Sequence, residues 1–295
     1  MDSPQLHFID CPDASGTHAM AYWAWGDATA SHTVVCVHGL TRQGRDFDAL
    51  AQALLARAPG PLRVICPDVA GRGRSAWLSD PQGYQIPQYA SDLLTLLRHL
   101  QPKTLDWVGT SMGGLIGLAL SQHASAAACA IRRLVLNDVG PVLEWQSLQR
   151  IGTYVGVQMR FDSEAQAVAA LAAISLGFGP HTPQQWLALS RPMLRTQPDG
   201  SVSLHYDPAI AQAFRAITPE AAVQGEAALW ALYDALTCPT LLLRGAHSDL
   251  LSVATAQAMT QRGPRAQLRE FDGVGHAPTL VVPEQTDAVC SFLFP

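Results

Sequence analysis

The sequence predicts an α/β protein in which a mostly parallel sheet is covered by helices. Three observations predict this class. Short β-branched apolar runs alternate with segments of helical periodicity, the runs are apolar on both faces as in buried parallel strands, and the alternation stops once and then resumes. With 295 residues and 48% hydrophobic content, the chain is long enough for a large core and one insertion.

The first half of the chain carries the clearest element pattern. Residues 5–10 and 19–26 alternate polar and apolar side chains, which predicts an antiparallel pair of strands. Buried strands are then predicted over residues 33–39, 62–68, 105–110 and 131–138, and helices over residues 46–58, 89–100 and 112–124. Because a strand, a helix and a next strand form a right-handed crossover, these strands are expected to lie parallel.

The alternation of strands and helices stops after the fourth predicted buried strand. Residues 142–236 are rich in Ala, Gln, Trp and Tyr, and they predict helices over residues 143–158, 163–175, 183–189, 208–214 and 219–236. The strand–helix theme then resumes with strands in residues 238–249 and 266–273 and helices over residues 252–261 and 283–294. We therefore predict a core formed by residues 1–141 and 237–295, with residues 142–236 inserted as a helical cap.

Charge and composition exclude several classes of partner. The net charge is −5, Lys103 is the single lysine, and the arginines form no dense run, so a nucleic-acid partner is not expected. No apolar stretch reaches the ~18 residues of a membrane span, and residues 1–16 lack the pattern of a signal peptide. The six cysteines form no CxxC or CxxH pair, so no metal site is predicted. We expect a cytoplasmic protein with reduced thiols.

A serine lies at a predicted corner between a strand and a helix. Residues 109–113 read GTSMG, which matches the G-x-S-x-G pattern of a nucleophile elbow. The apolar run ending at Val108 predicts the strand, and the run from Leu115 predicts the helix. Glycines suit this corner because a Cβ would obstruct the close approach of strand and helix. The context predicts that Ser111 is a nucleophile.

A serine nucleophile needs a base, and the base needs a carboxylate that orients it. His276 lies in the glycine-rich loop FDGVGHAP after the last predicted strand, and it is the predicted base. Asp249 and Asp138 both follow predicted parallel strands, so either can reach the carboxyl edge of the sheet. The order serine, acid, histidine favours Asp249, and Asp138 remains the alternative.

The turn after the strand at residues 33–39 predicts an oxyanion hole. The backbone N–H groups of Leu40 and Met112 are the expected donors, whereas His38 is expected to stabilise the turn. Arg42 and Arg45 follow this turn, and we considered them as partners for a substrate carboxylate. Paired surface arginines are the alternative interpretation of these two residues.

Taken together, these motifs resemble the α/β-hydrolase superfamily. They occur in the family's order across almost the whole chain, as HGLT (38–41), DVAGRGRS (68–75), GTSMGG (109–114), GAHSD (245–249) and GVGHAP (273–278). The resemblance implies an eight-stranded, mostly parallel sheet with a cap inserted after the sixth strand. It also implies the catalytic roles given above to Ser111, Asp249, His276, Leu40 and Met112. A serine at the nucleophile position argues against haloalkane dehalogenases and epoxide hydrolases, which carry aspartate there.

The predicted reaction is hydrolysis of a carboxylic ester through an acyl-enzyme. The aromatic, weakly charged cap favours a small, largely apolar substrate. A carbon–carbon bond hydrolase of the meta-cleavage type, a lactonase and a thioesterase remain open, as do an acyltransferase, a cofactor-free oxygenase and a non-catalytic ligand receptor. No motif implies an organic cofactor or a metal. The expected partner is a small-molecule substrate, and the expected assembly is a monomer or small homo-oligomer.

Overall fold

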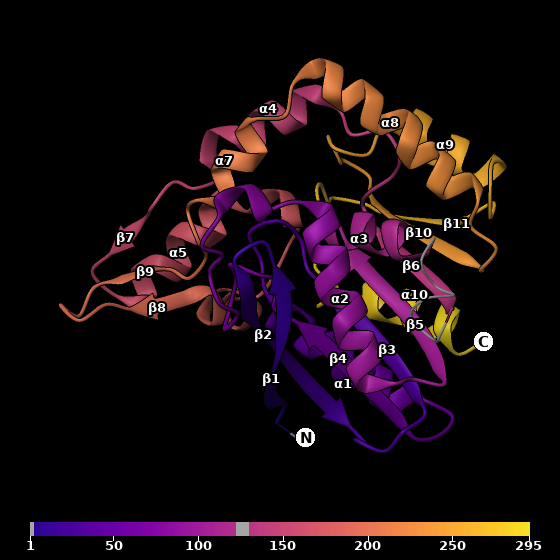
Figure 1. Cartoon of the computed structure of the whole chain (residues 1–295), viewed down its shortest axis with the longest axis horizontal. Coiled ribbons are helices and arrows are strands. Elements are labelled where there is room, and N and C mark those ends of the chain that lie inside the picture. Colours follow the sequence, from indigo (N-terminus) through magenta and orange to yellow (C-terminus); the bar gives the residue numbers. More distant parts are fainter. Residues whose placement is uncertain (1–2, 122–129) are drawn as a thin grey trace.

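The computed structural model describes residues 3–121 and 130–295. In this part of the chain, eight strands form one sheet in the order β1-β2-β4-β3-β5-β6-β10-β11 (Figure 1). Their bounds are β1 Gln5–Asp13, β2 Gly16–Gly26, β3 His32–Val37, β4 Leu62–Pro67, β5 Thr104–Thr110, β6 Ile131–Asn137, β10 Thr240–Gly245 and β11 Gln267–Phe271. β2 pairs antiparallel with β1 and β4, and the pairs from β4 to β11 are parallel. The predicted α/β fold is confirmed.

Helices cover both faces of the sheet because its central strands are apolar on both sides. The core helices are α1 Asp48–Arg57, α2 Ile86–Leu100, α3 Met112–Ser121, α9 Val253–Gln261 and α10 Pro283–Leu293, with single 3₁₀ turns at η1 Gly44–Phe47 and η2 Pro81–Gly83. On β5, Trp107 packs into the cluster under α2 and α3, whereas Val108 packs into the cluster under α1 and α10. β5 is therefore buried on both faces, and Ser111 directly follows its last residue.

The segment between β6 and β10 differs in part from its prediction. It contains α4 Trp145–Tyr154, β7 Arg160–Phe161, α5 Glu164–Ile174, η3 Leu176–Phe178, α6 Pro183–Ser190, η4 Arg191–Met193, β8 Leu194–Thr196, β9 Val202–Leu204, α7 Ile210–Arg215 and α8 Pro219–Asp234. The five helices were predicted, but the antiparallel sheet β7-β9-β8 was not. In Figure 1, α4, α7 and α8 arch over one end of the molecule, while the small sheet lies to one side. The division at residues 142 and 236 stays a prediction.

Two predictions fall partly on undescribed residues. The helix predicted over residues 112–124 begins as expected at Met112, and its residues 122–124, with His123, lie outside the described residues, as does Cys129. The other five cysteines are free thiols. No helix among the described residues is long and apolar enough to cross a membrane.

Candidate active site

Ser111 lies between the last residue of β5 and the first residue of α3. Its φ is 51°, in the left-handed region that L-residues rarely adopt. A Cβ at Gly109 would clash with the carbonyl of Gly113, and a Cβ at Gly113 would clash with the carbonyl of Val37. The two glycines are therefore required for this corner, which exposes the serine hydroxyl at the carboxyl edge of the sheet.

His276 links Ser111 to Asp138. His276 Nε2 lies 3.0 Å from Ser111 Oγ, and His276 Nδ1 lies 2.7 Å from Asp138 Oδ2. An ionised carboxylate only accepts hydrogen bonds, so we assign the ring proton to Nδ1. Nε2 then accepts from the serine hydroxyl. The histidine comes from the loop after β11, and Asp138 directly follows β6 with a φ of 56°.

The prediction that Asp249 orients the histidine is wrong. Its carboxylate instead pairs with Arg150, whose Nε and Nη2 lie 2.8 and 3.0 Å from the two oxygens. Both side chains are about half exposed, so the pair lies at the surface. The alternative, Asp138, is fully buried and contacts the imidazole.

Asp138 is held by two further donors. The backbone N–H of Gly245 donates to its Oδ1 over 2.9 Å, and the hydroxyl of Ser248 donates to its Oδ2 over 2.6 Å. The segment that suggested Asp249 therefore does contribute to the site, but through its neighbour Ser248. We did not predict Ser248, and its place in GAHSD was the available signal.

The predicted oxyanion donors flank the serine. A Cβ at Gly39 would lie 3.7 Å from Ser111 Cβ, so the turn that carries Leu40 passes beside the nucleophile. Within the described residues, the N–H groups of Leu40 and Met112 have no hydrogen-bond acceptor. They are thus free to bind an oxygen that develops negative charge.

His38 stabilises the turn from within. Its Nδ1 donates to the carbonyl of Gly39 over 2.7 Å, and its Nε2 accepts from the N–H of Val69 over 3.0 Å. Burial, together with the charges of Arg72 and Arg42, lowers the pKa of His38 to about 3. The ring is therefore neutral, which suits one donor and one acceptor.

Arg42 and Arg45 are already paired with carboxylates. Arg42 binds both oxygens of Asp46, and it also donates to the carbonyl of Leu189 over 3.1 Å. Arg45 binds both oxygens of Asp48 in the same way. This geometry favours the alternative interpretation, in which these arginines stabilise the fold and Arg42 ties the turn to the segment between β6 and β10.

The loop that carries His276 is fastened to that same segment. The N–H of Gly275 donates to the carbonyl of Gly177 over 2.6 Å. His181 Nε2 lies 2.7 Å from Thr279 Oγ1, on the other side of the catalytic histidine. Gly179 packs against this loop so closely that a Cβ would lie 2.9 Å from Val274 Cγ2. Hydrogen bonds to Gly177 and His181 therefore hold the histidine loop on both sides of His276.

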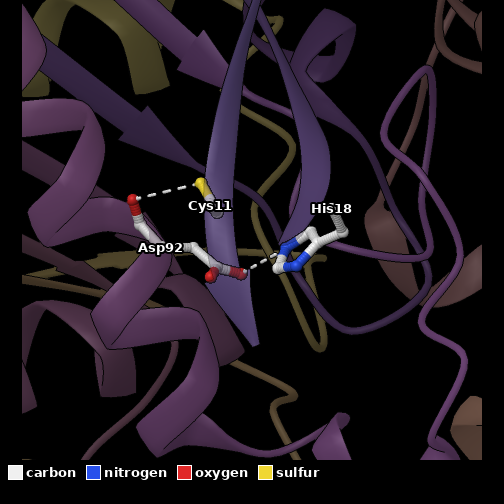
Figure 2. A group of neighbouring side chains, drawn as sticks. All are labelled: Cys11, His18 and Asp92. Carbon is white, nitrogen blue, oxygen red and sulfur yellow. Dashed lines mark hydrogen bonds and ion pairs between the residues drawn. The ribbon is translucent and has the colours of Figure 1, made fainter. Parts of the chain in front are cut away.

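Cys11, His18 and Asp92 form the one described group with the side chains to hold a metal ion (Figure 2). Its members already satisfy one another. His18 lies 3.1 Å from Asp92 Oδ2 through Nε2 and 3.0 Å from Asp13 Oδ2 through Nδ1, while the Cys11 thiol donates to the Asp92 carbonyl. Burial raises the pKa of Cys11 to about 12, which disfavours the thiolate that a metal needs. We interpret the group as a polar clamp between the β1–β2 hairpin and α2.

Comparison with known proteins identifies the family. The alpha/beta hydrolase family matches residues 34–291, which is most of the chain. The chain belongs to this family. A 3-hydroxybutyrate-oligomer hydrolase of Cupriavidus necator is 49% identical over 96% of this hydrolase and 95% of its own length. An esterase of Mycobacterium tuberculosis is 28% identical over 79% of this chain and 72% of its own.

Solved structures agree with this family. An alpha/beta hydrolase from Novosphingobium aromaticivorans superposes with a TM-score of 0.84 at 34% identity, and the match covers 99% of both chains. The resemblance stated from the motifs is thus confirmed at the level of the superfamily. Other relatives include putative carbamate hydrolases at 26% identity and a non-heme haloperoxidase at 23% identity, so the family alone does not define the bond that this hydrolase cleaves.

Proposed function

We propose that this hydrolase is a serine esterase that cleaves short oligomers of 3-hydroxybutyrate or closely similar hydroxy-acid esters. The observation that carries the proposal is the continuous line of hydrogen bonds from Ser111 through His276 to Asp138. The 49% identity to the oligomer hydrolase over nearly both full lengths supports the substrate class. We further propose a cytoplasmic location and a monomer or small homo-oligomer as the working form.

The reaction proceeds by acylation and deacylation of the serine. His276 Nε2 takes the proton from Ser111 as Oγ attacks the ester carbonyl, and Asp138 stabilises the imidazolium that forms. The N–H groups of Leu40 and Met112 bind the oxyanion. The imidazolium then returns the proton to the leaving alcohol, which in an oligomer is the hydroxyl of the next unit. Water, activated by the same imidazole, releases the acyl group as a carboxylic acid.

Aromatic side chains next to the histidine loop support a repeating ester with short methyl branches as the substrate. Phe178 and Trp186 lie in the segment that covers the histidine loop, and their rings stack with centroids 6.4 Å apart. Arg42 lies 5.7 Å from the Phe178 ring, and its charge is balanced by Asp46. We propose that these side chains favour a compact apolar acyl unit over a sugar or a phosphate ester.

The first experiment follows release of 3-hydroxybutyrate from its linear trimer by the wild type, by Ser111→Ala and by a surface control, Ser201→Ala. We expect turnover in the wild type and the control, and loss of at least about 10⁴-fold in Ser111→Ala because the nucleophile is absent. A butyryl thioester, a lactone and a meta-cleavage diketo acid are compared in parallel. Faster turnover of any of these than of the trimer would contradict the proposed substrate class.

A further inference from the structure

Arg72 is a fully buried arginine with no carboxylate partner among the described residues. Its guanidinium donates to the carbonyls of Leu40 and Ala70 over 2.8 and 2.6 Å, and to the hydroxyl of Tyr89 over 2.9 Å. The Tyr89 ring lies 4.9 Å from the guanidinium carbon. Carbonyl dipoles and a π face therefore stabilise a charge that burial without a counterion would otherwise disfavour.

The backbone on either side is built to direct this side chain inward. Gly71 and Gly73 have φ values of 82° and 53°, a region that glycine adopts without a steric penalty. A Cβ at Gly71 would lie 2.7 Å from the ring of Tyr84, and a Cβ at Gly73 would clash with the carboxylate of Asp68. Glycine is therefore required on both sides of Arg72 for the backbone to turn as tightly as it does here.

One planar group reaches both residues that carry the proposed oxyanion donors. Arg72 Nε binds the carbonyl of Leu40, and Arg72 Nη2 lies 3.7 Å from the sulfur of Met112. A guanidinium is rigid and always charged, so it fixes the two contacts relative to each other. The same charge helps to lower the pKa of His38, which lies in the Leu40 turn, although burial is the larger cause.

We infer that Arg72 is a positioning residue of the oxyanion site. It holds the Leu40 turn and Met112 at a fixed separation, and it adds a buried positive charge beside the place where the acyl oxygen becomes negative. Both effects act on the transition state more than on the bound ester, because the ester oxygen carries little charge before attack. The inference rests on the proposed acyl-enzyme chemistry.

The test compares Arg72→Lys and Arg72→Met with the same substitutions at Arg63. Arg63 also lacks a carboxylate partner within the described ranges, and it donates to the carbonyl of Leu100 over 3.0 Å and to Thr33 Oγ1 over 3.2 Å. It lies near the start of β4, at the opposite end of the sheet from Ser111. The Arg63 variants therefore report the cost of losing a partly buried arginine's contacts away from the site.

We expect kcat on the trimer to fall about 10-fold in Arg72→Lys, which keeps the charge, and about 100-fold in Arg72→Met. A trifluoromethyl ketone analogue of the ester should lose affinity by the same factors, because its oxygen is an oxyanion when bound to Ser111. In a Ser111→Ala background, the same variants should bind uncleaved trimer within about twofold of the parent. Arg63 variants should leave all three values unchanged.

The rate at which a fluorophosphonate labels Ser111 separates this inference from the choice of substrate. Labelling needs the nucleophile and the oxyanion donors but not the trimer, so it should slow in the Arg72 variants even if the physiological ester differs. Melting temperatures of all variants are measured first, and labelling and kcat are then compared at a temperature at which every variant is folded. The inference is overturned if folded Arg72→Met keeps wild-type labelling and kcat. It is also overturned if affinity for uncleaved trimer falls as much as affinity for the ketone.

Discussion

At the scale of the residue, Asp138 decides which nitrogen of His276 carries the proton. Its carboxylate accepts from Nδ1 over 2.7 Å, and Gly245 and Ser248 hold the carboxylate in place. This leaves Nε2 unprotonated and facing Ser111. An amide at position 138 would present a donor as well as an acceptor, so it would no longer enforce the same tautomer.

We therefore expect Asp138→Asn to lower kcat by about 10³- to 10⁴-fold, with a smaller change in KM. Asp249→Asn is the matched control, because it removes only a half-exposed pair with Arg150 that contributes about 0–1 kcal/mol to stability. Steady-state kinetics on the trimer checks both variants. Loss of activity in Asp249→Asn with retention in Asp138→Asn would restore the assignment made from chain order.

The sequence predicted the nucleophile and the base because each stands in a local pattern. It did not separate Asp138 from Asp249, since both follow parallel strands and both reach the same edge of the sheet. The separation depends on Arg150, which comes from α4 and holds Asp249 at the surface. A contact between residues 99 positions apart cannot be predicted from the local periodicity of the sequence.

At the scale of the element, η3 and the turn that follows it support the histidine loop. Gly177 accepts from Gly275, and Gly179 packs against Val274. We expect the alignment of His276 with Ser111 to depend on this contact, because Val274 and Gly275 directly precede His276 in the chain.

Gly179→Ala and Gly200→Ala test this dependence as a pair. Their φ values are +84° and +85°, so both substitutions strain the backbone, and the strain is larger at Gly179, whose ψ of −176° lies in a region that almost only glycine adopts. Only the first places a Cβ against Val274, 2.9 Å from its Cγ2, whereas the second meets open space. We expect the larger loss of melting temperature in Gly179→Ala and, at a temperature where both variants are folded, slower fluorophosphonate labelling of Ser111 in Gly179→Ala alone. Equal labelling rates would show that the loop does not need this support.

Hydrophobic periodicity in the sequence predicted the helices and the long strands, but it did not predict β7, β8 and β9. These strands have two or three residues each, which is too short for an alternation to register. Their pairing depends on residues brought together by α5, α6 and the turn at 197–201. Arg42 and Arg45 are a different case, because their carboxylate partners lie only four and three residues along the chain, and the alternative interpretation of paired arginines allowed for this.

At the scale of the whole molecule, the Cys11–His18–Asp92 clamp holds the antiparallel hairpin to the parallel part of the core. Burial alone would lower the pKa of His18, but hydrogen bonds to Asp92 and Asp13 and their charges outweigh it and raise the pKa. Hydrogen bonds from Ser15 and His18 lower the pKa of Asp13. Burial raises the pKa of Asp92, so Asp13 is the partner that stays ionised to lower pH.

The clamp makes stability depend on pH in a stated direction. A raised histidine pKa contributes stability that is complete below the ordinary value of 6.5 and is lost as the pH rises through the folded value. The contribution of Asp13 holds above its ordinary 3.8 and is lost as the pH falls through its lowered value. We expect His18→Gln to lower the melting temperature more at pH 5.5 than at pH 8.5.

His7→Gln is the control for this measurement, because His7 stacks on Tyr22 in the same hairpin and has no carboxylate partner among the described residues. It reports the loss of a hairpin imidazole that forms no ion pair within the described residues. A His18→Gln effect that grows with pH would show that the clamp holds the imidazole neutral. The pKa of His18 would then be lowered by folding, not raised.

The order of the catalytic groups along the chain has a consequence for biosynthesis. Ser111 and Asp138 come from consecutive strands, but His276 lies 165 residues after the serine and 138 after the aspartate. During synthesis, Ser111 and Asp138 therefore leave the ribosome long before His276 does. Until the chain has been made past β11, Ser111 lacks its proposed base, so the proposed hydrolysis requires β11 and the loop after it to be in place.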